Sequence, residues 1–394
     1  MGNKSTKEKY MFKNLDEIIK VIYTYSKNVF ENKEINNDML EFIINNFVKK
    51  EYTYDRHKIT NDINIFINLF KNNFTKTLNI DDYDYNNKLD DGSYGVIFNY
   101  GKYRVIKIIQ NEKKYIKLNI NNSVCVYQCI YPWMYEFCSY TVVMSILNYI
   151  DEITKSKYSK MFSQIYEPFI HTIDEQTIVI GYIMRKYEIT LNDEIKQINS
   201  MTDLSNGTSH IIDTLLNLRH LNYLRQLNIF ITHRDMKTTN IMIHNGDILF
   251  IDFSFLSMKI KCKNKEEMEM SKNIGNLVAT NEKYYDVIMF IASLLKYNVK
   301  YLKLLGEFIN MDVEEQLKNI LLMNNTALLN AFTIYNIYAF STKYNSLIDD
   351  KLGSKEFNIN LFSKIIELIK KIYGAINCIA YIEDKNFGKI KLKF

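Results

Sequence analysis

One segment near the middle of the chain carries the side chains that phosphate chemistry needs. Asp235 is followed two residues later by Lys237 and five residues later by Asn240. Asp252 stands twelve residues after Asn240, behind an apolar strand predicted over residues 248–251. A carboxylate can accept the proton of a hydroxyl group, and carboxylate and amide oxygens are ligands that Mg²⁺ prefers. The residue types in this segment could therefore accept a proton or hold a cation.

The same segment matches the pattern H-R-D-x-K-x-x-N of the protein-kinase catalytic loop. Residues 252–254, with the sequence D-F-S, stand where that family has D-F-G. Upstream, residues 89–98 resemble the glycine-rich loop, and residues 105–107 resemble the end of V-A-I-K. Because these motifs follow the family's order over roughly residues 85–300, the chain resembles a divergent eukaryotic-type protein kinase.

The resemblance implies a role in phosphoryl transfer for each residue of the loop. Asp235 would accept the proton of the substrate hydroxyl and orient it, and Lys237 would hold the γ-phosphate, as in Ser/Thr rather than Tyr kinases. Asp252 would bind Mg²⁺ between the β- and γ-phosphates, and Asn240 would bind the second Mg²⁺. His233 is expected to be structural. ATP and Mg²⁺ are therefore the expected cofactors.

The upstream motifs would hold the nucleotide. Gly92 and Gly95 would let the backbone of a turn approach the triphosphate, and Ile97 in the following strand belongs to the same binding set. Lys107 would place its charge on the α- and β-phosphates. Backbone groups at residues 184–187 would receive adenine.

Lys107 needs an acidic partner on the following helix. Glu136 is the candidate, because Tyr140 and Val143 continue its helical face. Glu112 is the rival, but it lies only five residues beyond Lys107, too close to belong to a separate helix. In the alternative interpretation neither residue has a function: Lys107 is an exposed lysine on a strand, and Glu136 lies on the surface of a helix.

Several positions depart from the family pattern. Ser254 removes easy access to positive φ, and Asp90 either brings a negative charge near the triphosphate or points outward. Asp286 resembles the aspartate that hydrogen-bonds the catalytic loop, but no A-P-E motif precedes it. The segment of about residues 255–281 is therefore short. Its acidic run at 266–269 would either supply the charge of an activation-loop phosphate permanently or, as the favoured interpretation, form a solvated loop. The short segment, the Y-Y-D sequence at 284–286, the AT-biased composition and the helical N-terminal extension resemble kinases of large DNA viruses, including poxviruses.

Two periodicities predict the elements that position these residues. Apolar residues at helical spacing predict helices within residues 10–80, over 133–148 and 208–227, and beyond 284. β-Branched and aromatic runs predict a hairpin over 95–109 and a buried strand over 178–184. Asp38 and Asn61 are the expected N-caps of the first region.

This order of elements predicts an α+β protein with a bilobal, protein-kinase-like fold. Residues 1–80 would form a helical N-terminal extension. Residues 81–187 would form a small β-rich N-lobe with the hinge, and residues 188–394 a helical C-lobe with C-terminal helices.

The composition fits a soluble globular protein, with 47% hydrophobic and 24% charged residues. A net charge of +5 does not argue for nucleic acid, so protein substrates are the expected partners and nucleic acid is not. Five cysteines without paired zinc spacing favour a reducing cytosol. No stretch reaches the roughly 18 apolar residues of a spanning helix.

The opening Met-Gly-Asn-Lys-Ser-Thr matches the pattern for N-myristoylation at Gly2. Lys4, Lys7 and Lys9 would add the attraction to anionic lipid that a single acyl chain needs. The alternative is a solvated start that matches by chance. We expect a cytoplasmic protein, in the host cytoplasm if viral, with peripheral membrane association or packaging in a virion as further locations; nothing indicates the oligomeric state.

Three functions compete. A Mg·ATP-dependent Ser/Thr protein kinase is favoured because every group that the reaction needs has a candidate. A pseudokinase scaffold, tethered to a membrane through Gly2, is favoured by Asp90, Ser254 and the missing A-P-E. A small-molecule kinase of the same fold would resemble H-G-D or H-A-D at the loop, and Arg234 and Lys237 argue against it.

Overall fold

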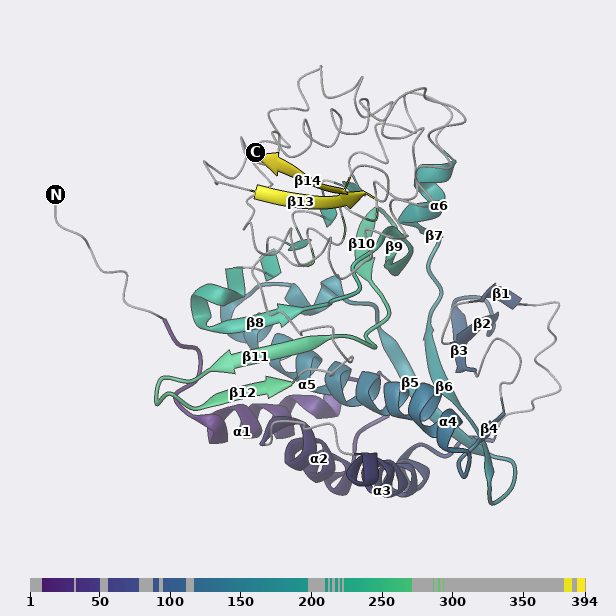
Figure 1. Ribbon diagram of the computed structural model, residues 1–394. Helices are drawn as coiled ribbons and strands as arrows, with labels where there is room; N and C mark the ends of the chain where they lie inside the picture. The colour runs from purple at the N-terminus through teal and green to yellow at the C-terminus, as the bar shows by residue number, and fades with distance from the viewer. Residues whose placement is uncertain are drawn as a thin grey trace. The chain divides into compact units, whose positions relative to one another are not determined.

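The structure is a computed structural model of mixed helix and sheet (Figure 1). It describes residues 9–31, 33–49, 56–77, 88–91, 95–110, 117–197 and 210–270 (without 212, 215, 216, 219 and 222), and residues 286, 290, 293, 379–384 and 388–393. The predicted α+β class is confirmed. Its bilobal arrangement and its division at residues 80 and 187 stay predictions.

The chain forms two compact units, each described here by itself. The first comprises Met1–Glu188, Arg225–Ile231 and Leu249–Ile274. The second comprises Ile189–Leu224, Thr232–Ile248 and Gly275–Phe394. The predicted site residues are therefore divided between the two units.

A curled antiparallel sheet forms one part of the first unit. Its strands are β1 (Lys88–Asp91), β2 (Gly95–Asn99), β3 (Arg104–Ile109), β4 (Leu118–Asn119), β5 (Ile165–Thr172) and β6 (Thr177–Arg185). They run in the order β1-β2-β3-β6-β4, and β5 pairs with β6 as well. Alternate residues of β2, β3, β5 and β6 form a core cluster of Val96, Phe98, Ile106, Ile108, Phe169, Val179 and Ile183. The predicted hairpin and the buried strand are confirmed.

The register of this sheet places Lys107 at its centre. Lys107 lies opposite Ile97 of β2 on one side and Tyr182 of β6 on the other. Gly95 pairs with Ile109, and a Cβ atom there would come within 2.9 Å of the carbonyl oxygen of Ile108. The close approach of β2 to β3 therefore favours glycine at position 95, whether or not a nucleotide binds there. Gly92 lies outside the described residues.

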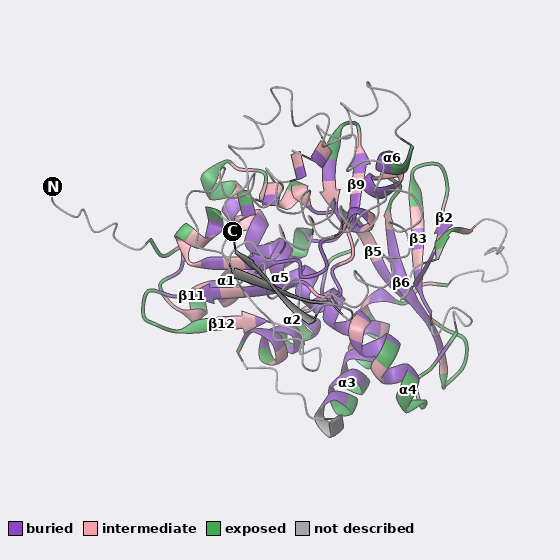
Figure 2. Ribbon diagram, turned by 45° about the horizontal axis from the view of Figure 1, so that its top comes forward, coloured by how far each residue is buried: buried purple, intermediate pink, exposed green. Residues whose placement is uncertain are grey.

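A long helix, α5 (Tyr131–Thr154), crosses the first unit and is buried on all sides over most of its length (Figures 1 and 2). It continues two short turns, α4 (Ser123–Cys125) and η5 (Val126–Ile130), and is followed by η6 (Tyr158–Met161). A helix that is apolar on every face is a core helix. The helix predicted over 133–148 is therefore confirmed and longer than predicted.

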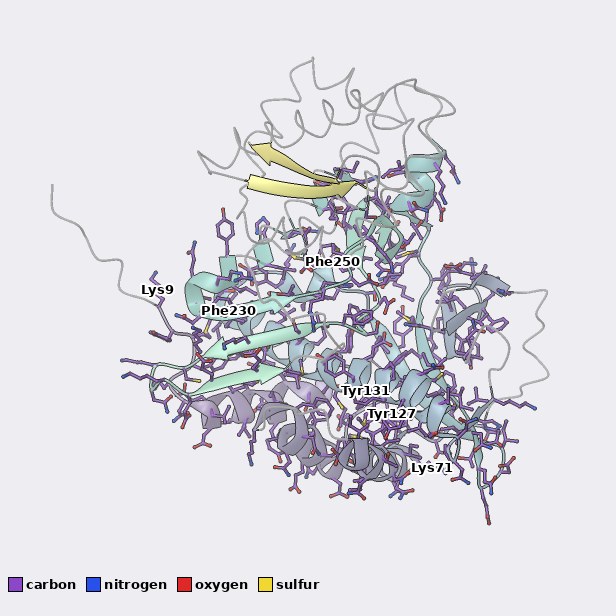
Figure 3. The ribbon with its side chains drawn as sticks, in the orientation of Figure 1. Lys9, Lys71, Tyr127, Tyr131, Phe230 and Phe250 are labelled. Carbon is purple, nitrogen blue, oxygen red and sulfur yellow. The ribbon has the colours of Figure 1, made fainter. Side chains whose placement is uncertain are left out.

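The N-terminal region is helical. It consists of α1 (Leu15–Tyr25), η1 (Ser26–Asn28), α2 (Asn37–Ile43), η2 (Ile44–Val48) and α3 (Arg56–Phe74). Of these, α1, η1 and α3 pack against α5, and α2 packs against α3. Figure 2 shows that α3 has one buried and one exposed face. Near the start of α5, Thr60 and Tyr127 share a hydrogen bond of 2.7 Å between hydroxyl oxygens (Figure 3). The N-terminal helices thus form one layer with the core helix.

Both predicted N-caps in this region are wrong. The cap of α2 is Asn36, whose side chain accepts from the N–H of Met39 at 2.9 Å. Asp38 lies in the first turn of the helix, where its negative charge interacts favourably with the positive end of the helix dipole. Asn61 lies in the interior of α3, which begins at Arg56.

A second small sheet of the first unit follows the D-F-S motif in sequence. It consists of β8 (Ile229–Thr232), β11 (Ser257–Lys261) and β12 (Glu267–Met270), in the order β12-β11-β8. Strands β11 and β12 pair antiparallel, with Lys259 opposite Glu269 and Lys261 opposite Glu267. The acidic run therefore belongs to a β-hairpin and its turn, where we predicted a solvated loop.

The second unit contains β7 (Ile189–Thr190), α6 (Leu191–Lys196), η8 (Thr238–Asn240) and β9 (Ile241–His244). At its chain boundaries lie η7 (Leu224–Leu227) and β10 (Asp247–Phe250), and a sheet has the order β10-β9-β7. Strands β13 (Ile379–Asp384) and β14 (Gly388–Lys393) pair antiparallel. The described residues between 210 and 223 are helical, as predicted, whereas most of the helices predicted beyond 284 lie outside the described residues.

No helix in the described ranges is long and apolar enough to cross a bilayer.

Candidate active site

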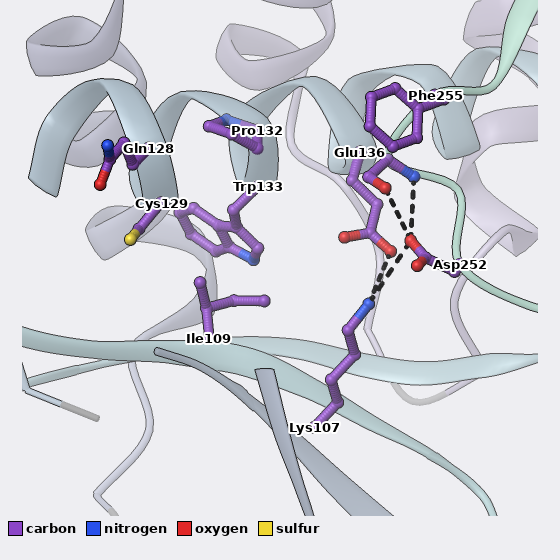
Figure 4. Close-up of a pocket in the computed structure, with 10 residues that line it drawn as sticks. Lys107, Ile109, Gln128, Cys129, Pro132, Trp133, Glu136, Asp252 and Phe255 are labelled. Carbon is purple, nitrogen blue, oxygen red and sulfur yellow. Dashed lines mark hydrogen bonds and ion pairs between the residues drawn. The ribbon is translucent and has the colours of Figure 1, made fainter. Parts of the chain in front are cut away.

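The first unit brings three of the predicted site residues together. The amino group of Lys107 on β3 lies 3.2 Å from Glu136 Oε1 on α5 and 4.0 Å from Asp252 Oδ1 (Figure 4). The Lys107 and Glu136 side chains are 15% and 6% exposed, so this ion pair is largely removed from water. Glu136 is thus a partner of Lys107, as predicted. The rival, Glu112, lies outside the described residues.

Electrostatics keep Lys107 charged in this buried position. Burial alone would lower the pKa of Lys107, but the carboxylates of Glu136 and Asp252 raise it above its ordinary value. Burial raises the pKa of Glu136, and the charge of Asp252 adds to the rise while Lys107 opposes it. The cluster therefore presents a cation held between two carboxylates.

Asp252 is fixed by its own neighbours along the chain. Its φ is +65°, a left-handed value that a non-glycine residue rarely adopts. Its Oδ1 accepts from the hydroxyl of Ser254 at 2.7 Å and lies 3.4 Å from the backbone N–H of Ser254. Strained backbone of this kind is found preferentially at functional sites.

Helix α5 also anchors the residues around Asp252. The N–H of Phe253 donates to Glu136 Oε1 at 3.4 Å, and its ring centroid lies 4.8 Å from that of Tyr140. Tyr135 donates to the carbonyl oxygen of Leu256 at 2.7 Å. One helix thus holds both the partner of Lys107 and the D-F-S segment.

Tyr135 and Tyr140 were absent from the predicted site. Helical spacing could have indicated Tyr140, since it lies four residues after Glu136 and so on the same face. Tyr135 does not share that face, and no pattern in the sequence marks it.

A small recess lies beside this cluster. It is lined by Lys107, Ile109, Gln128, Cys129, Pro132, Trp133, Glu136, Asp252, Ser254 and Phe255 (Figure 4). Its accessible volume of about 10 Å³ holds about one water molecule. The recess therefore holds a water-sized group, and Lys107, Glu136 and Asp252 lie in its wall.

The second unit brings the catalytic-loop residues together. The amino group of Lys237 lies 2.7 Å from Asp235 Oδ2. The Nδ2 of Asn240 donates at 2.9 Å both to Asp235 Oδ2 and to the carbonyl oxygen of Asp235. The Asp235 side chain is 4% exposed, so these contacts fix its orientation.

Two buried side chains accept hydrogen bonds from the backbone N–H groups of this loop. Asp286 accepts from the N–H of His233 at 2.7 Å and from that of Arg234 at 2.8 Å, which confirms the expected contact. Arg234 has φ +69° and is, like Asp252, a strained non-glycine residue. Ser293 accepts from the N–H of Thr238 at 2.9 Å, a contact that the sequence did not indicate.

The donor set of these clusters fits magnesium in its chemistry. Because Asn240 directs its Nδ2 toward Asp235, its Oδ1 is the atom oriented to meet a cation. Asp252 supplies a carboxylate. Mg²⁺ is held by one or two such oxygens together with phosphate and water, not by a cage of protein ligands. The described residues contain no cluster of three His, Cys, Asp or Glu side chains suited to a metal.

Comparisons with known proteins add little to this geometry. No protein-family model and no curated protein matches the chain. Among solved structures, the chain is similar to vaccinia related kinase 3, with 8% identity and a TM-score of 0.28 over 43% of this chain and 46% of that one. The chain thus spans less than half of that structure. At this level the likeness assigns no family, and the function has to be argued from the two clusters of side chains.

Proposed function

We propose that the protein is a serine/threonine protein kinase, which transfers the γ-phosphate of ATP to protein hydroxyls with Mg²⁺. The observation that supports this most is the buried pair of Lys107 and Glu136, 3.2 Å apart on a central strand and a core helix, with Asp252 4.0 Å from the same lysine. A strand lysine paired with a helix glutamate, near a metal-binding aspartate, is the arrangement that phosphoryl transfer by kinases requires.

In this proposal the first unit binds and neutralises the triphosphate. Lys107, kept charged by its two carboxylate neighbours, attracts the α- and β-phosphates. Asp252, whose side chain accepts a hydrogen bond from Ser254, would hold the cation. Bound Mg²⁺ supplies neutralisation of the charge on the β- and γ-phosphates. Gly95 and Ile97 on β2 lie across the sheet from this region of β3, in keeping with a nucleotide-covering strand.

The second unit then prepares the acceptor. Asp235 accepts a hydrogen bond from the substrate hydroxyl and receives its proton as that oxygen attacks the γ-phosphorus, while the bond from phosphorus to the β–γ bridging oxygen breaks and ADP leaves. Asn240 holds that carboxylate and offers its own oxygen to the second cation. The amino group of Lys237, which contacts Asp235 in the structure, binds the γ-phosphate either in place of Asp235 or together with it. We include in this proposal that both sets of residues serve one transfer reaction.

The test is transfer of label from γ-labelled ATP to protein in a lysate and to the protein itself. We expect wild type to transfer label, and Asp235→Asn and Asp252→Asn each to lose roughly 100-fold or more of the rate. Asp247→Asn is the matched control, because Asp247 is an exposed aspartate outside both clusters. Equal labelling by wild type and Asp235→Asn would contradict the proposal.

The pseudokinase scaffold remains the second candidate, supported by one specific contact. The Ser254 hydroxyl takes one lone-pair site of Asp252 Oδ1, so fewer sites of that carboxylate are open to a cation, although capacity is left on both oxygens. Asp90 gives this candidate less support, because it is exposed on β1. Nucleotide binding without transfer would favour the scaffold.

Other expectations stay predictions. They include protein substrates as the partners, the resemblance to viral kinases, the cytoplasmic location and peripheral membrane attachment. Gly2 and Lys4 lie outside the described residues. Intact mass of protein made in a eukaryotic host tests acylation, since an unmodified mass excludes the anchor.

A further inference from the structure

We propose that Ser254 is a positioning residue, which fixes the carboxylate of Asp252 for its cation; this rests on the function proposed above. Serine stands here where the motif it resembles has glycine. A glycine could offer only its backbone N–H. The side chain of Ser254 therefore adds a contact that the motif alone does not provide.

The geometry of the contact is that of a short, part-buried hydrogen bond. The Oγ of Ser254 donates to Asp252 Oδ1 at 2.7 Å, and Ser254 is 6% exposed. A hydrogen bond to an ionised carboxylate is shorter and about twice as strong as one between neutral groups. The backbone N–H of Ser254 lies 3.4 Å from the same oxygen. Two donors from one residue thus converge on Oδ1.

This convergence fixes the direction of the other carboxylate oxygen. The backbone of Asp252 is held by its φ of +65° and by the contacts of Phe253 with α5. The remaining freedom is rotation of the aspartate side chain. With Oδ1 held by Ser254, that rotation is restricted and Oδ2 keeps one direction. A carboxylate has about four lone-pair sites, so Ser254 leaves capacity on both oxygens for a cation.

A purely structural role makes a different prediction. If Ser254 only stabilised the turn after Asp252, its loss would lower the thermal stability without changing metal affinity. If it positions Asp252, its loss weakens metal binding, because partners that orient a ligand typically contribute 10- to 100-fold to affinity. Metal affinity therefore separates the two roles.

The experiment measures Mn²⁺ binding by electron paramagnetic resonance, in the full-length protein with ADP. We expect Ser254→Ala to weaken Mn²⁺ binding about tenfold, and Ser254→Thr, which keeps a hydroxyl, to stay within about twofold of wild type. Asp247→Ala is the control for general effects. The same variants are compared for KM of Mg·ATP, for kcat and for thermal unfolding. Ser254→Thr keeps the test valid if Ser254→Ala does not fold, since a tenfold loss in a folded Thr variant would contradict the proposal.

The outcomes also separate this inference from the proposed function. If wild type transfers phosphate and Ser254→Ala binds Mn²⁺ as tightly as wild type, with or without a lower melting temperature, Ser254 does not position Asp252 and the kinase proposal stands. If wild type with ADP binds no Mn²⁺ and transfers no label, the kinase proposal fails and this inference fails with it. Weak binding in the Ala variant and normal binding in the Thr variant support the inference.

Discussion

At the scale of single residues, the central feature is one lysine between two carboxylates. Lys107 keeps its charge because Glu136 and Asp252 together outweigh the effect of burial. The two carboxylates repel each other, and Asp252 contributes to the raised pKa of Glu136. The cluster is therefore stable only while the lysine is present and is sensitive to the protonation of Glu136.

The first prediction concerns pH. Because burial raises the pKa of Glu136, this side chain takes up a proton at a higher pH than an ordinary glutamate, and the ion pair with Lys107 is lost as the pH falls. Wild-type transfer should therefore decline on the acid side of neutrality. Glu136→Gln should be slower by on the order of 100-fold and lack that decline. An unchanged acid limb in Glu136→Gln would assign the decline to another group.

The second prediction concerns the support of the catalytic loop. Asp286→Ala would leave the N–H groups of His233 and Arg234 buried without their carboxylate, so we expect a loss of about 2–4 kcal/mol in the free energy of unfolding. Asp286→Asn keeps one oxygen acceptor and should lose about half as much. Urea unfolding measures both. An Ala variant as stable as wild type would show that the loop does not depend on this carboxylate.

Residue identities were predictable where spacing encodes them. The register with Tyr140 predicted that Glu136 faces Lys107, and the structure places them 3.2 Å apart. The contact of Ser254 with Asp252 was not predictable, because it depends on side-chain rotamers at a strained backbone position. The same holds for Ser293, which contacts Thr238 from 55 residues away in sequence.

At the scale of elements, an aromatic layer joins α3 to α5. Phe70 of α3 lies 4.5 Å from Trp133 and 5.2 Å from Phe137, measured between ring centroids. Phe66 lies 5.4 Å from the ring of Trp133. Trp133 and Phe137 flank Glu136 on α5, so this layer also fixes the helix that carries the partner of Lys107.

The third prediction follows from this layer. Phe70→Ala should lower the free energy of unfolding by about 3–5 kcal/mol, because it removes a fully buried ring. Transfer activity of the folded fraction should fall too, since α5 loses a support next to Glu136. Ile65→Ala is the matched control, because Ile65 is exposed on the same helix and its loss should change stability by less than about 0.5 kcal/mol. Equal effects at positions 65 and 70 would contradict the packing described.

A second element-scale feature is the strap of residues 9–15, which binds the turn of the β11–β12 hairpin. Lys263 and Asn264 donate their N–H groups to the carbonyl oxygens of Phe12 and Lys13, each at 3.0 Å. The N–H of Leu15 donates to Glu266 Oε2 at 2.7 Å. The segment after the D-F-S motif is therefore tied to the start of the chain.

The fourth prediction uses Cys262 as a reporter of this strap. Burial, together with Glu266 and Glu17, raises the pKa of Cys262 to about 11, so the thiol stays protonated near neutral pH and should react slowly with iodoacetamide. Phe12→Ala should accelerate alkylation several-fold by opening the strap. Lys13→Ala, whose side chain is 81% exposed, should not. Mass spectrometry of the Cys262 peptide gives the rate, and equal rates in all three proteins would show that the strap does not cover this site.

Elements were predictable where local periodicity decides them. The hairpin β2–β3, the strand β6 and the core helix α5 all follow from apolar spacing. The β11–β12 hairpin was missed because its alternating glutamates suggested a solvated loop. Its methionine and isoleucine faces are buried against other elements, and such long-range packing overrides local polarity.

At the scale of the whole molecule, the α+β class is established, and the joint action of the two units is the proposal. The first unit carries Lys107, Glu136 and Asp252, and the second carries Asp235, Lys237 and Asn240. The sequence predicted both sets from motif order. That the two sets act on one nucleotide is part of the proposal and follows from the resemblance alone.

The most direct test of this joint action is a double-mutant cycle on phosphoryl transfer. Rates of label transfer from γ-labelled ATP are measured for wild type, Asp235→Asn, Asp252→Asn and the double variant. Residues that act as a unit in one reaction give strongly non-additive losses. We expect the double variant to be no slower than the slower single variant. Losses that multiply, or single variants as fast as wild type, would contradict the claim that both units serve one transfer reaction.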